Sequence, residues 1–414
     1  MTNRDGQQRG VSRRTIVKEL AGLAVLGVTG GSLVWLTHVQ ESQSSTLLPN
    51  ATPPPVAAQS ITSSGMMFGV DPEHSHVNPG EHFLLPTNVS HLRPYWTAST
   101  GGVIESSPAV VNGVVYVGSG DSKLYAFNAS TGNTLWSATI GGPIRSSPAV
   151  ANGIVYVGCD DNKLYVFDAP TGNTFWAAAT GGFIRSSPTI SNGVFYVGAD
   201  DHTLYAFNTV AGGSLWNAFA EGSIESSPAV AKGVVYVGSG DYKLYAFNAS
   251  TGALFWTAST GNHIFSSPAV ANGVVYIGSD DHKLYAFNAS TGTLLWAAFT
   301  RGFVRSSPAV ANDVVYVGSD DHKLYAFNAS TGTLLWVAST GGYVRSSPTV
   351  ANGVVYVGSD DAKIYAFNAS TGAFLWAVST RGLVRSSPAV ANGVVYAGSD
   401  DHKLYAFHLP GTMP

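Results

Sequence analysis

Tryptophan returns at a strict interval of forty residues along most of this chain. The positions, which show no drift, are Trp96, Trp136, Trp176, Trp216, Trp256, Trp296, Trp336 and Trp376. A Ser-Ser-Pro triplet, first seen at Ser106, and an aromatic triplet of Tyr-Ala-Phe type, last seen at Phe407, keep the same interval. Eight copies of one unit therefore predict a fold made of eight equal parts.

Each copy contains four short runs of strand type. In the sixth copy they are residues 306–310, 314–318, 323–327 and 334–338, and the segments between them are rich in Asn, Asp and Gly. These three residues tolerate the backbone geometry of tight turns. The pattern predicts an all-β fold, an eight-bladed β-propeller with four-stranded antiparallel blades.

The two ends of the repeat array complement each other. The last copy stops after its third strand, at residues 403–407, whereas Trp96 precedes the first Ser-Ser-Pro triplet. One strand is missing at the end, and one is spare at the start. We therefore expect residues of about 93–99 to form the outer strand of the eighth blade and to close the ring.

Residues 1–40 have the character of a targeting element. The segment Ser12-Arg-Arg-Thr-Ile-Val-Lys18 resembles a twin-arginine export motif, and an uncharged apolar run follows at residues 20–36. The alternative is an ordinary basic flank before a membrane segment. Residues 1–40 are therefore predicted to be a twin-arginine-like signal or an N-terminal membrane anchor. The sequence favours an anchor that is not cleaved. The propeller is then expected outside the cytoplasm, on the periplasmic or cell-surface side, tethered by residues 20–36.

Two further segments precede the repeats. Residues 41–65 are rich in Pro and Ser and predict a flexible linker. Residues 66–91 predict an ordered lead-in segment, and residues 92–410 the propeller itself. The lead-in contains His74, His76 and His82, but their spacing matches no zinc pattern, so no metal site is predicted.

Charged residues make up only 11% of the chain, and the net charge is -4. No broad basic field is available for a polyanion, so no nucleic acid partner is expected.

One column of residues, just before each Ser-Ser-Pro triplet, varies between copies whereas the strands hardly vary. It should circle the mouth of the central channel, on the face that also carries the Asp-rich turns. Its members are Glu105, Arg145, Arg185, Glu225, Phe265, Arg305, Arg345 and Arg385. Two interpretations are open: the arginines bind a carboxylate or phosphate ligand, or arginines and carboxylates neutralise each other around the ring.

The repeat Ala286-Phe-Asn288-Ala-Ser-Thr291-Gly292-Thr-Leu-Leu-Trp296 resembles the tryptophan-docking motif of the quinoprotein, or PQQ-like, propeller family. The resemblance covers about 340 residues. It implies that each tryptophan is a structural residue that packs on a neighbouring blade. The chain departs from the motif by having Asn where the family has Asp, except at Asp168, and by having Ala211 in place of Thr.

The resemblance also separates two functions. Dehydrogenases of this family use a vicinal cysteine pair, calcium and an Asp base, whereas Cys159 is the only cysteine of this chain. The better match is the non-catalytic branch, similar to the propeller component of the outer-membrane β-barrel assembly machinery. We therefore expect a monomeric, non-catalytic scaffold without a cofactor that binds a protein or polymeric ligand through its charged face. A PQQ-dependent dehydrogenase is the alternative.

Overall fold

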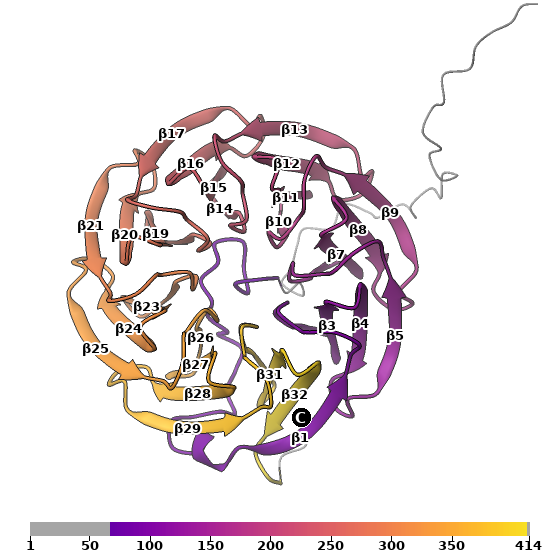
Figure 1. Cartoon of the computed structure of the whole chain (residues 1–414), viewed down its shortest axis with the longest axis vertical. Helices are drawn as coiled ribbons and strands as arrows, with labels where there is room; N and C mark the ends of the chain where they lie inside the picture. The colour runs from indigo at the N-terminus through magenta and orange to yellow at the C-terminus, as the bar shows by residue number, and fades with distance from the viewer. Residues whose placement is uncertain (1–66, 412–414) are drawn as a thin grey trace, which may run out of the picture. The chain divides into compact units, whose positions relative to one another are not determined.

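The computed structural model describes residues 67–411, which form eight four-stranded antiparallel sheets in a closed ring (Figure 1). The predicted eight-bladed β-propeller is thereby confirmed. The predicted signal or anchor (1–40) and linker (41–65) lie outside the described residues. Within the described part, no helix is long and apolar enough to cross a membrane.

The innermost strand of each blade has three residues. These strands are β2 (Ala109–Val111), β6 (Ala149–Ala151), β10 (Thr189–Ser191), β14 (Ala229–Ala231), β18 (Ala269–Ala271), β22 (Ala309–Ala311), β26 (Thr349–Ala351) and β30 (Ala389–Ala391). The second strands are β3 (Val114–Ser119), β7 (Ile154–Cys159), β11 (Val194–Gly198), β15 (Val234–Gly238), β19 (Val274–Ser279), β23 (Val314–Ser319), β27 (Val354–Ser359) and β31 (Val394–Ser399).

The third strand carries the Tyr-Ala-Phe triplet. These strands are β4 (Lys123–Asn128), β8 (Lys163–Asp168), β12 (Thr203–Asn208), β16 (Lys243–Asn248), β20 (Lys283–Asn288), β24 (Lys323–Asn328), β28 (Lys363–Asn368) and β32 (Lys403–His408). The outer strand carries the tryptophan, in β5 (Thr134–Thr139), β9 (Thr174–Ala179), β13 (Ser214–Phe219), β17 (Leu254–Ser259), β21 (Leu294–Phe299), β25 (Leu334–Ser339), β29 (Phe374–Ser379) and β1 (Arg93–Ser99).

The eighth blade is closed by the start of the repeat region. Its strand order is β1-β32-β31-β30, and β1 pairs antiparallel with β32, so that Thr97 lies opposite Tyr405. The first and last strands thus share one sheet, as the ends of the repeat array predict.

The inner strands are shorter than the sequence pattern predicts, because the Ser-Ser-Pro triplets bond in another way. In the sixth copy the strand begins at Ala309 rather than at Ser306. The Ser306 hydroxyl accepts a hydrogen bond from the Gly318 amide of its own blade, at 3.1 Å, and the Ser307 amide donates to the Ser347 hydroxyl of the next blade, at 3.0 Å. Pro308 has no amide hydrogen to add to a ladder.

The hydrophobic core is divided into clusters between neighbouring blades. One such cluster joins Tyr236 and Leu244 of one blade to Ile277 and Phe287 of the next. The outer-strand tryptophans extend these contacts, since the Trp256 indole donates a hydrogen bond to the Ala289 carbonyl of the next blade, at 3.2 Å. Equivalent bonds are made by Trp96, Trp136, Trp216, Trp296 and Trp336.

Residues 67–78 lie in the channel, and residues 79–91 then lead outward to the ring. Four carbonyl groups of residues 67–78 accept hydrogen bonds from successive inner strands: the amides of Val230, Val270, Val310 and Val350 donate to Pro72, Glu73, Ser75 and His76. The segment is seen at the centre of the ring in Figure 1. It leaves through the short helix η1 (Val89–His91), which leads directly into β1.

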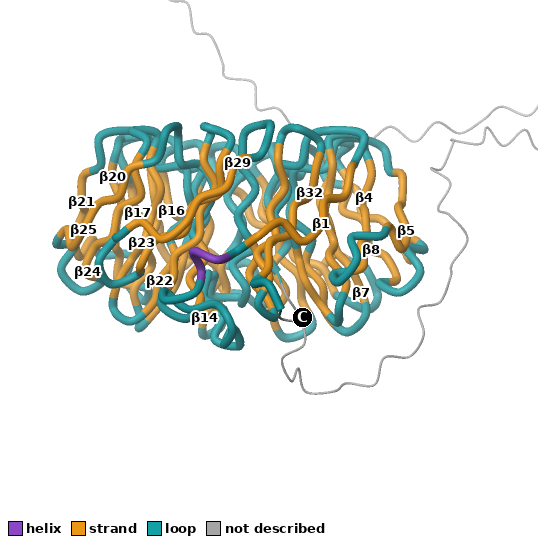
Figure 2. Tube along the Cα trace, turned by 90° about the horizontal axis from the view of Figure 1, so that it is seen from below, coloured by secondary structure: helices purple, strands orange, loops and turns teal. Residues whose placement is uncertain are grey.

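The ring has two loop faces with the strands running between them (Figure 2). On one face, the connections between blades contact the turns that join second and third strands, as in the bond from the Gly120 amide to the Val103 carbonyl. On the other face, the Asn-Ala-Ser-Thr-Gly turns contact the inner hairpins, as in the bond from Ala129 to Gly113.

Candidate functional site at the channel mouth

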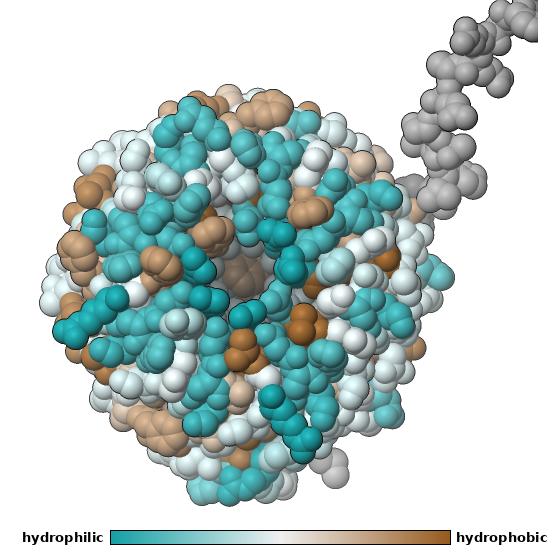
Figure 3. Space-filling model, in the orientation of Figure 1, coloured by the Kyte–Doolittle hydropathy of each residue, from teal (hydrophilic) through white to brown (hydrophobic). Residues whose placement is uncertain are grey.

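The variable column of residues surrounds the channel mouth, on the face formed by the connections between blades. Figure 3 shows a central hollow on this face, with hydrophilic residues around it and hydrophobic atoms deeper inside. We call this ring of residues the rim. It consists of Glu105, Arg145, Arg185, Glu225, Phe265, Arg305, Arg345 and Arg385, together with the first turn aspartates Asp160, Asp200, Asp280, Asp320, Asp360 and Asp400.

The rim arginines pair with carboxylates of their own blade or of a neighbouring blade. Arg145 lies 3.1 Å from Glu105 and 2.7 Å from Asp160. Glu105 also accepts a hydrogen bond from Arg385, at 3.1 Å, and so bridges the last blade and the first. In these contacts, arginines and carboxylates neutralise each other, which is one of the two interpretations of the sequence.

Further pairs extend this arrangement around most of the mouth. Arg345 lies 3.0 Å from Asp320 and 3.9 Å from Asp360. On the other side, Arg185 lies 3.6 Å from Asp160 and 3.7 Å from Glu225. The run of ion pairs therefore spans the blades from Asp320 through the seam to Glu225.

Carboxylates outnumber arginines in the rim. Eight carboxylates face five arginines, which leaves an excess of negative charge at the mouth. Burial, together with neighbouring acidic groups such as Asp160 and Asp201, raises the pKa of Asp200, against the lowering effect of Arg185. The mouth is therefore acidic overall, which does not suit a small anion.

Aromatic side chains that stand two residues before the rim arginines stack on them. The Arg305 guanidinium lies 5.0 Å from the centre of the Phe303 ring, and Arg345 lies 4.9 Å from Tyr343. Both aromatic side chains are more than a third exposed. The sequence shows that this position varies between copies. It does not show the stacking, because stacking depends on the conformations of two side chains in one loop.

The second aspartate of each turn has a structural role. Asp321 accepts a hydrogen bond from the Tyr325 hydroxyl at 2.6 Å, and the other copies repeat this contact. Desolvation and the bond to Asp121 raise the pKa of Tyr125 to about 12, so the phenol stays protonated as the donor. This pairing follows from the four-residue spacing of Asp and Tyr, which the sequence analysis did not use.

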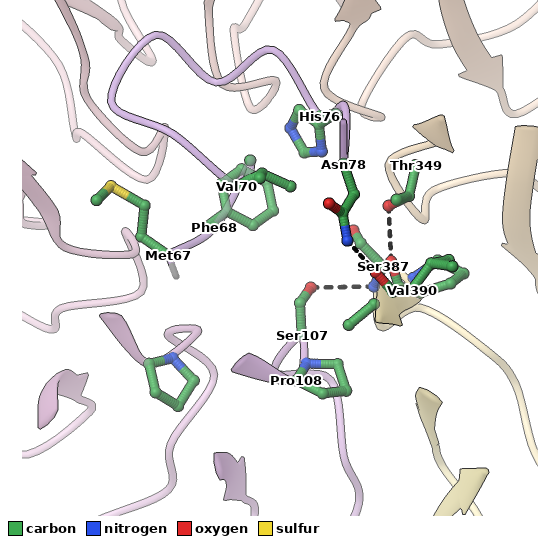
Figure 4. A pocket seen from close by; sticks show the side chains of 14 residues that line it. Met67, Phe68, Val70, His76, Asn78, Ser107, Pro108, Thr349, Ser387 and Val390 are labelled. Carbon is green, nitrogen blue, oxygen red and sulfur yellow. Dashed lines mark hydrogen bonds between the residues drawn. The ribbon is translucent and has the colours of Figure 1, made fainter. Parts of the chain in front are cut away.

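Below the rim, the chain itself fills the channel. Figure 4 shows Met67, Phe68 and His76 around a pocket that Pro108 and Val390 also line. Asn78 from the same segment donates a hydrogen bond to the Val390 carbonyl, at 2.6 Å.

Two histidines of this segment are buried. Burial lowers the pKa of His74 to about 4 and that of His76 to about 3, so both are neutral near pH 7. The Nε2 atom of His74 lies 2.9 Å from the Thr189 hydroxyl, whereas Nε2 of His76 has no partner among the described residues. Within residues 67–411, no group of three or more His, Cys, Asp or Glu side chains is arranged to hold a metal ion.

The repeat region of the chain matches the model of a known protein family. The family model described as outer membrane protein assembly factor BamB matches residues 91–182, 126–228, 160–266, 249–348 and 339–411, which together cover the propeller. The chain belongs to this family. The resemblance to a PQQ-like propeller similar to BamB is thereby confirmed. A search of curated proteins found no relative of this BamB-family chain.

Solved structures share the BamB-type fold at low sequence identity. BamB from Moraxella catarrhalis is 20% identical, with a TM-score of 0.67, over 77% of this chain and 99% of that one. The computationally designed protein Ika8 is 20% identical, with a TM-score of 0.64, over 75% and 98%. A europium-containing methanol dehydrogenase is 14% identical, with a TM-score of 0.74, over 83% and 98%. Identities this low show the fold alone.

Proposed function

We propose that this chain is a non-catalytic scaffold that binds a protein partner through the rim. One observation carries the proposal: the contacts that hold the blades together repeat almost unchanged, whereas the rim differs from blade to blade. Its eight column positions contain Arg, Glu and Phe. Such variation in charge and aromatic character on an exposed ring of a regular array fits a surface adapted to a partner.

The pairing of the rim favours a protein partner over a small anion. Arg305 makes three hydrogen bonds of 2.9 to 3.3 Å to Asp280, which is buried. A small anion would have to displace that carboxylate. A protein surface can instead add its own charges to the rim and cover the exposed rings of Phe303 and Tyr343.

The description of the family is consistent with a protein partner, because it names a factor in the assembly of outer membrane proteins. We further propose that this chain acts outside the cytoplasm, tethered by residues 20–36, and that it works as a monomer.

A PQQ-dependent dehydrogenase is the alternative from the sequence, and the fold alone does not separate the two, since a dehydrogenase shares it. Residues 67–78 of the chain itself occupy the channel below the rim. This favours the scaffold over a cofactor-binding dehydrogenase. Addition of PQQ and calcium should give no dye reduction with alcohols. Turnover in that assay would contradict the non-catalytic assignment.

The scaffold proposal is tested by partner capture from an extracytoplasmic fraction. The tagged wild-type protein is compared with the double variant Arg345→Ala plus Arg385→Ala and with Leu294→Ala plus Leu334→Ala, which changes the exposed outer strands. We expect loss of capture only in the rim variant. Equal capture by all three proteins would contradict a rim interface.

A further inference from the structure

At one junction between blades, the rim repeats the two carboxylates found at another junction but lacks the arginine between them. Between blades 1 and 2, Arg145 lies between Glu105 and Asp160, at 3.1 and 2.7 Å. Between blades 4 and 5, the equivalent residues three repeats later are Glu225, Phe265 and Asp280, in the same order. Both junctions also have glycine at the first turn position, Gly120 and Gly240, where the other six blades have aspartate. The two junctions thus differ at the residue between the two carboxylates, which is Arg145 in one and Phe265 in the other.

The two carboxylates beside Phe265 are paired very differently. Asp280 binds Arg305 through both of its oxygens. Glu225 has one ion-pair contact among the described residues, at 3.7 Å to Arg185, and that guanidinium is also close to Asp160 and Asp200. Burial and the neighbouring Asp200 raise the pKa of Glu225. Glu225 therefore lacks the close cation that Glu105 has in Arg145.

Aromatic side chains lie at the same junction. The His263 ring stacks on Phe265, with centroids 5.7 Å apart, and meets the edge of Tyr242 at 4.8 Å. Tyr242 is 43% exposed. We call Glu225, Tyr242, His263 and Phe265 the notch. It combines a weakly paired carboxylate with exposed π systems, and these are the two groups that attract a guanidinium.

We propose that the notch binds an arginine side chain of the protein partner, which takes the role that Arg145 has between blades 1 and 2. This inference rests on the proposed scaffold function and names the chemistry by which the rim recognises its partner. The incoming guanidinium pairs with Glu225 and packs against Phe265, as Arg305 already does from the next blade, at 5.2 Å. It also reduces the excess negative charge of the rim.

A titration with a small probe tests the proposal directly. The probe is the peptide acetyl-Gly-Arg-Gly-amide, and the control peptide carries uncharged citrulline in place of arginine. Isoleucine methyl groups report binding by NMR: Ile224 and Ile264 precede Glu225 and Phe265, whereas Ile144 and Ile184 precede Arg145 and Arg185. We expect the arginine peptide to shift the first pair of methyl signals and not the second. Equal shifts with both peptides, or shifts at all four residues, would overturn the proposal.

Variants move the site from one junction to the other. Phe265→Arg supplies the missing cation from the chain itself and should abolish the shifts of Ile224 and Ile264. Glu225→Gln should weaken binding of the arginine peptide about tenfold, an amount typical of a lost charge-assisted contact. Arg145→Phe should create a second notch, so that Ile144 begins to respond. In the absence of peptide, unchanged signals from isoleucines remote from the substitution, such as Ile364, show that each variant is folded.

The outcomes for the notch and for the scaffold function are separable. Partner capture that survives Phe265→Arg but is lost with Arg345→Ala plus Arg385→Ala would overturn the notch and leave the rim interface standing. Capture that is insensitive to every rim substitution would remove the scaffold proposal, and the peptide titration would still decide whether the notch binds arginine.

Discussion

At the scale of single residues, seven of the eight docking tryptophans, all except Trp376, lie against a glycine of the next blade. The backbone of Gly332 has a φ of +70°, and a Cβ atom built there would lie 2.7 Å from the indole of Trp296. A side chain at this position would both strain the turn and push the ring out of its place. The same relation repeats around the ring, for example between Gly252 and Trp216.

We predict that Gly332→Ala destabilises the fold by about 2–4 kcal/mol, because the strain of a positive φ adds to the loss of indole packing. The control is Gly273→Ala, where φ is +77° and a Cβ atom would meet nothing within 4 Å. That variant should lose only about 1 kcal/mol. Urea unfolding measures both values. Equal losses would show that the indole does not depend on this glycine.

The buried histidines predict an acid-sensitive fold. Because the pKa values of His74 and His76 in the folded protein, about 4 and 3, lie below the ordinary 6.5, the unfolded chain binds more protons between these values. Their contribution to stability is present above pH 6.5 and is lost as the pH falls toward 4. In urea unfolding at pH 7 and pH 5, His76→Phe should reduce the pH dependence. The surface variant His282→Gln should leave it unchanged, and an unchanged slope in His76→Phe would contradict this account.

At the scale of the elements, the Ser-Ser-Pro triplets join the inner strands into a ring of hydrogen bonds. The amide of the second serine in each copy donates to the hydroxyl of its counterpart in the next blade, from Ser107 to Ser147 and onward, until Ser387 donates back to Ser107 at 3.0 Å. Each blade is therefore bonded to both neighbours near the axis, across the seam as elsewhere.

We predict that Ser227→Ala costs about 1–3 kcal/mol, because it leaves the Ser187 amide without its acceptor in a buried place. Ser250→Ala, in an exposed turn, is the matched control and should change stability by less than about 0.5 kcal/mol. Thermal unfolding of the two variants provides the comparison. A neutral effect of Ser227→Ala would mean that water replaces the bond.

The sequence predicted the elements where local pattern decides their place. The forty-residue interval and the strand left over at Trp96 were sufficient for the blade number and for closure by β1. The start of the inner strands was predicted too early, because the bonds of Ser306 and Ser307 depend on contacts between strands that no local pattern records. The path of residues 67–78 was not predictable either, since they pair with blades far away in the sequence. The ion pairs of the rim were one of two predicted arrangements, and choosing between them required the positions of the turn aspartates.

At the scale of the whole molecule, the start of the described chain contributes to the ring in two separable ways. Residues 67–78 lie in the channel and bond to the inner strands, whereas β1 completes the eighth blade. We predict that a variant beginning at residue 67 keeps the stability of the full chain. One beginning at residue 92 should be less stable but still closed, and one beginning at residue 101 should expose β32 and aggregate. Thermal unfolding and size-exclusion chromatography measure these outcomes, and a soluble, stable protein lacking β1 would contradict the role of the seam.

The path of residues 72–76 also has a consequence for biosynthesis. The ribosome makes this segment before any of the strands to which it bonds. β32, the partner of β1, is made after every other strand of the ring. Ring closure therefore cannot precede synthesis of the last strand, and it joins the first and last strands of the propeller.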